Sequence, residues 1–140
     1  MAWNVQYLPD CAVIETRYSG NIAPEELKAA AVRTLELARE HDTTLLLGDC
    51  TELHGGHDIV DLYGIVQLVV GQGLPRVIHE AIVMPQMQSA ARDVEFWRTA
   101  ARNRGLDVTI VKTREEGLAW LAAVPVPSKA VHRGAATDKT

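Results

Sequence analysis

Residues 45–58 read Leu45-Leu46-Leu47-Gly48-Asp49-Cys50-Thr51-Glu52-Leu53-His54-Gly55-Gly56-His57-Asp58, and an apolar run at residues 59–70 follows them. The pattern is that of a buried strand that ends in a polar turn, then two glycines, then the start of a helix. Ligand sites in open α/β sheets lie beyond the carboxyl ends of the strands. We therefore expect this junction to carry the functional residues.

The composition indicates one soluble domain. The 140 residues are enough to enclose a hydrophobic core without disulfides. The chain has 14 basic and 18 acidic residues, whereas nucleic-acid binding depends on clustered Lys and Arg, so nucleic acid is not an expected partner. Cys11 and Cys50 lack C-x-x-C spacing, which favours reduced thiols. The amino terminus does not resemble a signal peptide, and no apolar stretch is long enough to span a bilayer, so we expect a cytoplasmic protein.

The hydrophobic periodicity predicts the element order β-β-α-β-α-β-α-β-α. This order defines an α/β fold with a mixed five-stranded sheet, flanking helices and the opening strand as the antiparallel edge. We expect one domain at residues 1–124 and a flexible polar tail at 125–140. The expected strands are 3–8, 12–18, 43–48, 80–84 and 107–111, and the expected helices are 24–40, 58–71, 89–104, with Ser89 as N-cap, and one that follows the capping box at 113–116.

The second helix is apolar around most of its circumference. In a small domain, a helix on a sheet normally leaves one flank in water, so the excess apolar surface predicts self-association as a homodimer. Gly64 and Gly71 would permit close approach of a second helix, although internal packing is the alternative. The residues expected at the dimer contact are Ile59, Leu62, Tyr63, Val66 and Val70.

The junction offers several kinds of chemistry. The candidate residues are Asp49, Cys50, His54, Gly55, Gly56, His57 and Asp58. Thiolate, imidazole and carboxylate groups bind metals, but their spacing here matches no standard site, and we expect no metal or cofactor. Cys50 would be a nucleophile only if a neighbouring charge lowered its pKa. The simplest interpretation is that the glycines form the turn and Asp58 caps the helix.

The element order and several short motifs resemble the STAS domains (sulfate transporter and anti-sigma-factor antagonist), and more closely their SpoIIAA-like or STAS/SEC14 branch. The resemblance implies a regulatory or binding module rather than an enzyme. In anti-sigma antagonists of this type, the phosphorylated serine lies in the segment that matches Gly56-His57-Asp58-Ile59, which has no hydroxyl group here. The motifs are Tyr7-Leu8-Pro9-Asp10, Arg17-Tyr18-Ser19-Gly20, Pro24-Glu25-Glu26-Leu27, Leu47-Gly48-Asp49-Cys50-Thr51, Gly55-Gly56-His57, Phe96-Trp97 and Asn103-Arg104-Gly105.

Three functions follow as hypotheses. The first is a non-enzymatic regulatory or protein-interaction module that acts through the turn at 49–58 and the helix behind it. The second, from the SEC14 side of the resemblance, is a carrier of a small apolar ligand or lipid. Such a carrier requires a cavity on the order of several hundred cubic ångströms, which we expect Val66, Val70, Met84 and Met87 to line. The third is an enzyme that depends on Cys50 or a metal, with a His nitrogen near the Cys50 sulfur.

Overall fold

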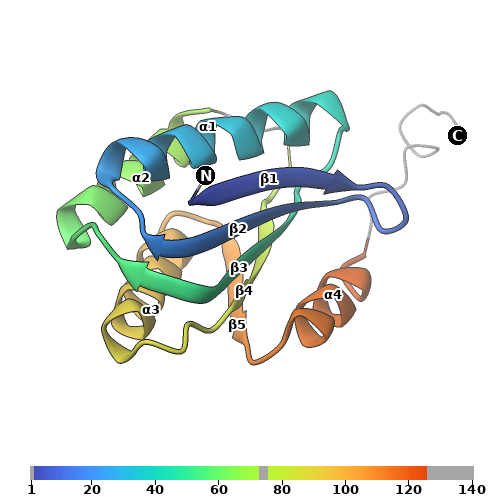
Figure 1. Cartoon of the computed structure of the whole chain (residues 1–140). Coiled ribbons are helices and arrows are strands. Elements are labelled where there is room, and N and C mark those ends of the chain that lie inside the picture. The colour runs from blue at the N-terminus through green and yellow to red at the C-terminus, as the bar shows by residue number, and fades with distance from the viewer. Residues whose placement is uncertain (1, 73–75, 126–140) are drawn as a thin grey trace, which may run out of the picture.

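The computed structural model describes residues 2–72 and 76–125 (Figure 1). Its element order is the predicted one. The predicted tail lies outside the described residues, apart from Pro125. The elements are β1 (Trp3–Leu8), β2 (Val13–Asn21), α1 (Pro24–Glu40), β3 (Leu45–Gly55), α2 (Ile59–Gly71), β4 (His79–Val83), α3 (Gln88–Arg102), β5 (Asp107–Val111) and α4 (Arg114–Ala122).

The five strands lie in the sheet in chain order, β1-β2-β3-β4-β5. β1 pairs antiparallel with β2, and the other three pairings are parallel. Because each crossover steps to the next strand in the same direction, right-handed connections place their helices on one face of the sheet. Figure 1 shows α1 and α4 on opposite sides. The predicted mixed sheet and its antiparallel edge strand are confirmed.

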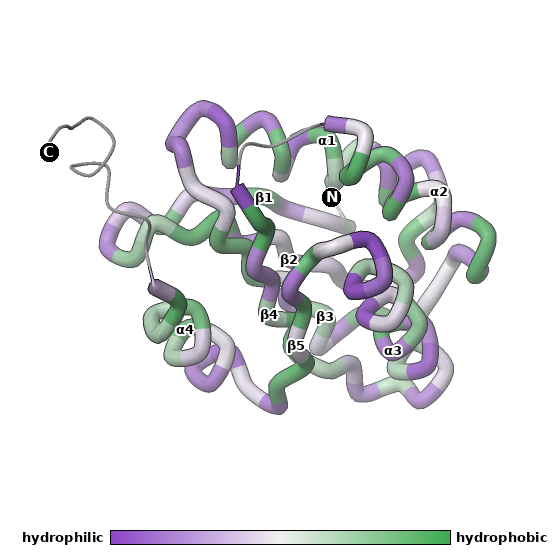
Figure 2. Tube along the Cα trace, turned by 180° about the vertical axis from the view of Figure 1, so that it is seen from behind, coloured by the Kyte–Doolittle hydropathy of each residue, from purple (hydrophilic) through white to green (hydrophobic). Residues whose placement is uncertain are grey.

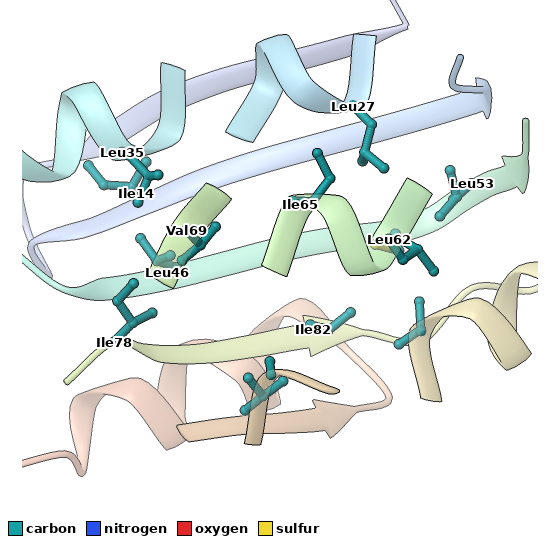
Figure 3. Close-up of a cluster of buried hydrophobic side chains, with 14 of the residues drawn as sticks. Ile14, Leu27, Leu35, Leu46, Leu53, Leu62, Ile65, Val69, Ile78 and Ile82 are labelled. Atoms are coloured by element: carbon teal, nitrogen blue, oxygen red, sulfur yellow. The ribbon is translucent and has the colours of Figure 1, made fainter. Parts of the chain in front are cut away.

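Each face of the sheet has its own core. Successive residues of a strand point to opposite faces, so Leu46 belongs to the cluster under α1, α2 and α3, while Leu47 packs with Leu121 of α4. Figure 3 shows side chains of α1 and α2, including Leu35 and Ile65, directed toward the strands. Hydrophilic and hydrophobic residues alternate along α1 and α3 (Figure 2), as expected for amphipathic helices with one solvent-exposed side.

The most important departure from the predicted elements is the length of β3. The expected polar turn at 49–55 is the second half of this strand, because the long β2 remains paired with it as far as the Asn21–Gly55 pair. The register shifts twice, between Arg17 and Ser19 and again between Gly20 and Asn21, and at each shift β3 carries one extra residue, a β-bulge. The turn itself is confined to residues 56–58.

Several other boundaries also differ from prediction; β2 extends to Asn21, for example, and β3 begins at Leu45 instead of Thr43. Helix α3 begins at Gln88 with Met87 as its N-cap, instead of after Ser89, because Met87 still has an extended backbone (φ −76°, ψ 127°) and its carbonyl accepts the first helical hydrogen bond, from Ala91. Strand β4 begins at His79, one residue early. Among the described residues, no helix combines the length and apolar character that crossing a bilayer requires.

Candidate functional site

The junction residues predicted from the sequence do not form one cluster, because Asp49 and Cys50 are on opposite faces of β3. Asp49 accepts hydrogen bonds from the Thr51 hydroxyl (2.6 Å), the Thr51 amide (3.1 Å) and Nε of Arg17 (3.4 Å). Burial alone would raise the pKa of Asp49, but these donors outweigh burial and the pKa falls below its ordinary value. The Asp49 carboxylate therefore stabilises the bulged part of β3.

Cys50 faces the helices instead. It is buried, and desolvation together with the nearby carboxylates of Glu80 and Asp49 raises the pKa of its thiol. Among the described residues, no side chain is hydrogen-bonded to its sulfur, so the His partner that the enzyme hypothesis requires is not in place. At neutral pH the Cys50 thiol is protonated.

The last residues of the junction connect the end of β2 to the start of α2 through hydrogen bonds to the Ile22 backbone. Gly56 has φ +100°, and a Cβ there would lie 2.6 Å from the backbone nitrogen of Ile22. The Ile22 amide donates to the Gly55 carbonyl, and Nδ1 of His57 donates to the Ile22 carbonyl (3.0 Å). Asp58 accepts from the Asp61 amide (3.0 Å), which lowers the pKa of Asp58 and confirms it as the N-cap.

The remaining junction residue, His54, lies at the surface. It is exposed and lines a shallow groove with Glu52 of the same strand and Met87. The structure thus separates the two histidines, His54 in the groove and His57 against the Ile22 carbonyl. Within residues 2–72 and 76–125, no group of three His, Cys, Asp or Glu side chains is placed to hold a metal ion.

Helix α2 divides the residues predicted for the dimer contact into two groups. Leu62 and Val66 are buried within their own chain, Val66 completely (0 % exposed). This result corrects their assignment to an interface, because a second chain cannot reach side chains that the protomer itself already covers. The other predicted residues, Ile59, Tyr63 and Val70, are exposed, and so is Val60 (77 %), which the prediction omitted.

A cavity of about 100 Å³ lies between the sheet and helices α1, α2 and α3. The four residues expected to line a carrier cavity, Val66, Val70, Met84 and Met87, are not part of its wall. Val66 packs in the core away from the cavity, and Val70 and Met87 point outward. The wall is mainly apolar and comes from residues such as Leu46, Ile65 and Val94.

Glu80 of β4 is the polar group of this cavity that the sequence analysis did not single out. Its Oε1 accepts a hydrogen bond from Nε1 of Trp97 (2.8 Å). Burial raises the pKa of Glu80 to about 7, although the Trp97 donor acts in the opposite direction. Its Oε2 lies over Gly48, 3.5 Å from the position that a Cβ would take. The sequence feature that could have identified Glu80 is a carboxylate inside an otherwise apolar strand that is covered on both faces.

The other face of the sheet carries a second buried acid. Glu15 is 1 % exposed and accepts two hydrogen bonds from Arg114, from Nε (2.7 Å) and Nη2 (3.1 Å). Gln6 donates a third (3.1 Å). Burial acts to raise the pKa of Glu15, but the Arg114 and Gln6 donors outweigh it and the pKa is lowered. This carboxylate is fully paired and connects β2 to α4.

Comparison with known proteins identifies the architecture. No protein-family model and no curated protein matches the sequence. A crystal structure of an uncharacterized protein of the DUF3478 family from Shewanella loihica PV-4, described as having a SpoIIAA-like fold, matches with a TM-score of 0.58. The match covers 86 % of this chain and 92 % of the other, at 20 % sequence identity. The chain has a SpoIIAA-like fold.

This SpoIIAA-like fold agrees with the resemblance predicted from the motifs. The segment 56–59 lies at the N-terminus of α2, where the resemblance places a phosphorylated serine in the anti-sigma antagonists. Here His57 contacts the Ile22 carbonyl, and Asp58 contacts Asp61. Both side chains at this position of the SpoIIAA-like fold therefore have intramolecular partners.

Proposed function

We propose that the protein is a non-enzymatic regulatory or protein-interaction module that works as a homodimer through the exposed flank of α2. The observation that carries the proposal is that four large apolar side chains of one helix point into solvent. The α2 flank, as we call this surface, consists of Ile59, Val60, Tyr63, Gly64, Gln67, Val70 and Gly71.

A second copy of the chain is the partner that suits this surface. A twofold interface places a surface against itself, so each charge on it would approach the same charge of the other protomer. The α2 flank has no charged residue of its own, and the charge that lies against it is the guanidinium of Arg104, which covers part of the Tyr63 ring and donates to the Tyr63 hydroxyl. A Cβ at Gly64 or Gly71 would meet no atom within 4 Å, so a second helix has room to approach the α2 backbone. Exposed apolar area of this kind favours association.

The rest of the site supports a binding role rather than catalysis. Asp49, His57 and Asp58 are engaged in bonds that hold β2, β3 and α2 together. The raised pKa of Cys50 disfavours the nucleophilic thiolate. Cys11 and Cys50 are both free thiols, which is consistent with the reducing cytoplasm that we propose as the location.

The hypothesis that the protein carries a lipid has less support than the hypothesis of an interaction module. Ligand sites usually measure about 300–1,000 Å³, whereas the cavity under the helices measures about 100 Å³. A lipid chain would therefore require the helices to move away from the sheet. A much smaller molecule fits without such a movement.

Sedimentation velocity of the purified chain and three variants tests the dimer. We expect the wild type to sediment as a dimer and Val60→Glu as a folded monomer, because Val60 is 77 % exposed and has little packing to lose. Val32→Glu, on the outer side of α1, is the matched control and should remain dimeric. Val66→Asp should unfold the chain, because it places a charge in the core. A monomeric wild type, or a dimeric Val60→Glu, would contradict the proposal.

A further inference from the structure

The cavity between the sheet and helices α1, α2 and α3 contains two polar groups whose hydrogen-bonding capacity is not used. Within the described chain, no group donates a hydrogen bond to Oε2 of Glu80, while its Oε1 is occupied by Trp97. Tyr18 is half-buried and also lines the cavity, and its hydroxyl has no hydrogen-bond partner among the described residues. Buried polar groups normally have partners, so an unsatisfied carboxylate oxygen and phenol in one cavity indicate a missing ligand group.

The charges of the wall determine which ligand group fits. Among the residues that the structure describes, no Lys or Arg lines the cavity; the acidic residues of its wall are Glu80 and Asp93, and the one basic side chain is His57. A carboxylate or phosphate ligand would be repelled by Glu80 and would find no guanidinium or ammonium partner. A protonated amine supplies N–H donors, which are what the free Glu80 oxygen requires. The rings of Tyr18 and Trp97 also line the cavity and attract cations.

Size and polarity define the rest of the molecule. A cavity of roughly 150 Å³ with apolar walls holds benzene, so the volume of about 100 Å³ suits a chain of a few carbon atoms. The aliphatic side chains of Leu62, Ile65 and Val69 from α2 cover it and provide an apolar environment for such a chain. Figure 3 shows these three side chains directed toward the sheet.

We propose that this cavity binds a small primary amine with a short apolar body, whose ammonium group donates hydrogen bonds to Oε2 of Glu80 and to the Tyr18 hydroxyl oxygen. The site is distinct from the α2 flank, because it lies on the side of α2 that faces the sheet. The inference does not depend on the dimer.

The test is an NMR titration of ¹⁵N-labelled full-length protein with n-butylamine at constant pH. The reporter is the indole N–H signal of Trp97, because this group is bonded to the same carboxylate that would receive the ligand. We expect a saturable shift of this signal with n-butylamine, at least about tenfold weaker binding of 1-butanol, which has the same length without charge, and no shift with butyrate. The absence of a saturable shift, or equal binding of butanol and butylamine, would overturn the proposal.

Three variants locate the binding. Glu80→Gln keeps an oxygen to accept from Trp97 but removes the charge, and should weaken n-butylamine binding about tenfold or more. Tyr18→Phe removes only a hydroxyl without a described partner, so it should fold normally and bind several-fold more weakly. Glu52→Gln, an exposed acid outside the cavity, is the matched control and should bind as the wild type does. Equal losses in Glu80→Gln and Glu52→Gln, or full binding by Tyr18→Phe, would contradict the assignment.

Discussion

The ionisation of one residue, Glu80, makes the stability of the whole fold depend on pH. Its pKa is raised from 4.5 to about 7 in the folded chain because it is buried. At low pH the carboxyl is protonated in both states, and between these two values only the unfolded chain gives up the proton. The contribution of Glu80 to stability is therefore complete below about pH 4.5, is lost as the pH rises to about 7, and stays constant above that.

We expect the free energy of unfolding to decrease by up to about 3 kcal/mol through this window. The measurement is urea unfolding between about pH 4.5 and 8 for the wild type and for Glu80→Gln, whose side chain does not titrate. The wild type should therefore lose stability relative to Glu80→Gln as the pH rises from about 4.5 to 7, because only the wild-type side chain ionises in this window. Parallel curves for the two proteins would show that Glu80 does not carry the effect. Glu15 and Asp49, with lowered pKa values, act only at more acidic pH.

Gly56 provides a second prediction at the scale of one residue. Ala at this position would need φ +100° and would place its Cβ 2.6 Å from the Ile22 nitrogen, a backbone atom that cannot swing aside. Gly105 also has a positive φ (+92°), but nothing lies within 4 Å of its Cβ position. We expect Gly56→Ala to destabilise the fold by about 3 kcal/mol and Gly105→Ala by about 1 kcal/mol. Chemical denaturation measures both; equal losses would mean that the contact with Ile22 is unimportant.

At the scale of elements, α4 is the one described helix that covers the second face of the sheet, and it is held there by the Arg114–Glu15 pair as well as by Leu121. Arg114→Met would leave the Glu15 carboxylate buried with Gln6 as its remaining donor. We expect a loss of about 2 kcal/mol, less than for a fully buried pair because the Arg114 side chain is 35 % exposed. Adding Glu15→Gln should restore part of the loss, because an amide needs no counter-charge.

The matched control for this prediction is Arg33→Met. Arg33 also pairs with a carboxylate, that of Glu36, but both side chains are about half exposed. Pairs of this kind contribute about 0.5 kcal/mol or less. Thermal or urea unfolding of the four proteins separates the two cases. If Arg114→Met and Arg33→Met lose the same small amount, the Glu15 pair does not hold α4.

The order of the elements could be predicted from the sequence, whereas the length of β3 and the cavity could not. Hydrophobic periodicity and the caps at Asp58 and Thr113 were enough for the order of the nine elements, because those signals are local. The extension of β3 through residues 49–55 was not predictable in this way, because polar residues there are held by pairing with β2, a contact distant in the sequence. The cavity was not predictable for the same reason, since Tyr18, Glu80 and Trp97 come together only in the folded chain.

At the scale of the whole molecule, the arrangement of the sheet explains why α2 is the helix left for a partner. The three crossover helices share one face, and α2 lies between α1 and α3, which it contacts on either side. Its inner side covers the sheet through Leu62 and Ile65, so its outer side is the part that remains in water. Placing an apolar residue such as Val60 there lowers solubility unless a partner covers it.

Self-association through this surface predicts a concentration-dependent melting temperature. Because a dimer dissociates on unfolding, mass action raises the melting temperature as the protein concentration increases. We expect this increase for the wild type and for Val32→Glu, whereas Val60→Glu should melt at one temperature at all concentrations, with an unchanged circular dichroism spectrum. The measurement is differential scanning calorimetry over about two orders of magnitude in concentration. A constant melting temperature for the wild type would leave the apolar α2 flank without its proposed partner, because a monomer has no second protomer to cover Val60.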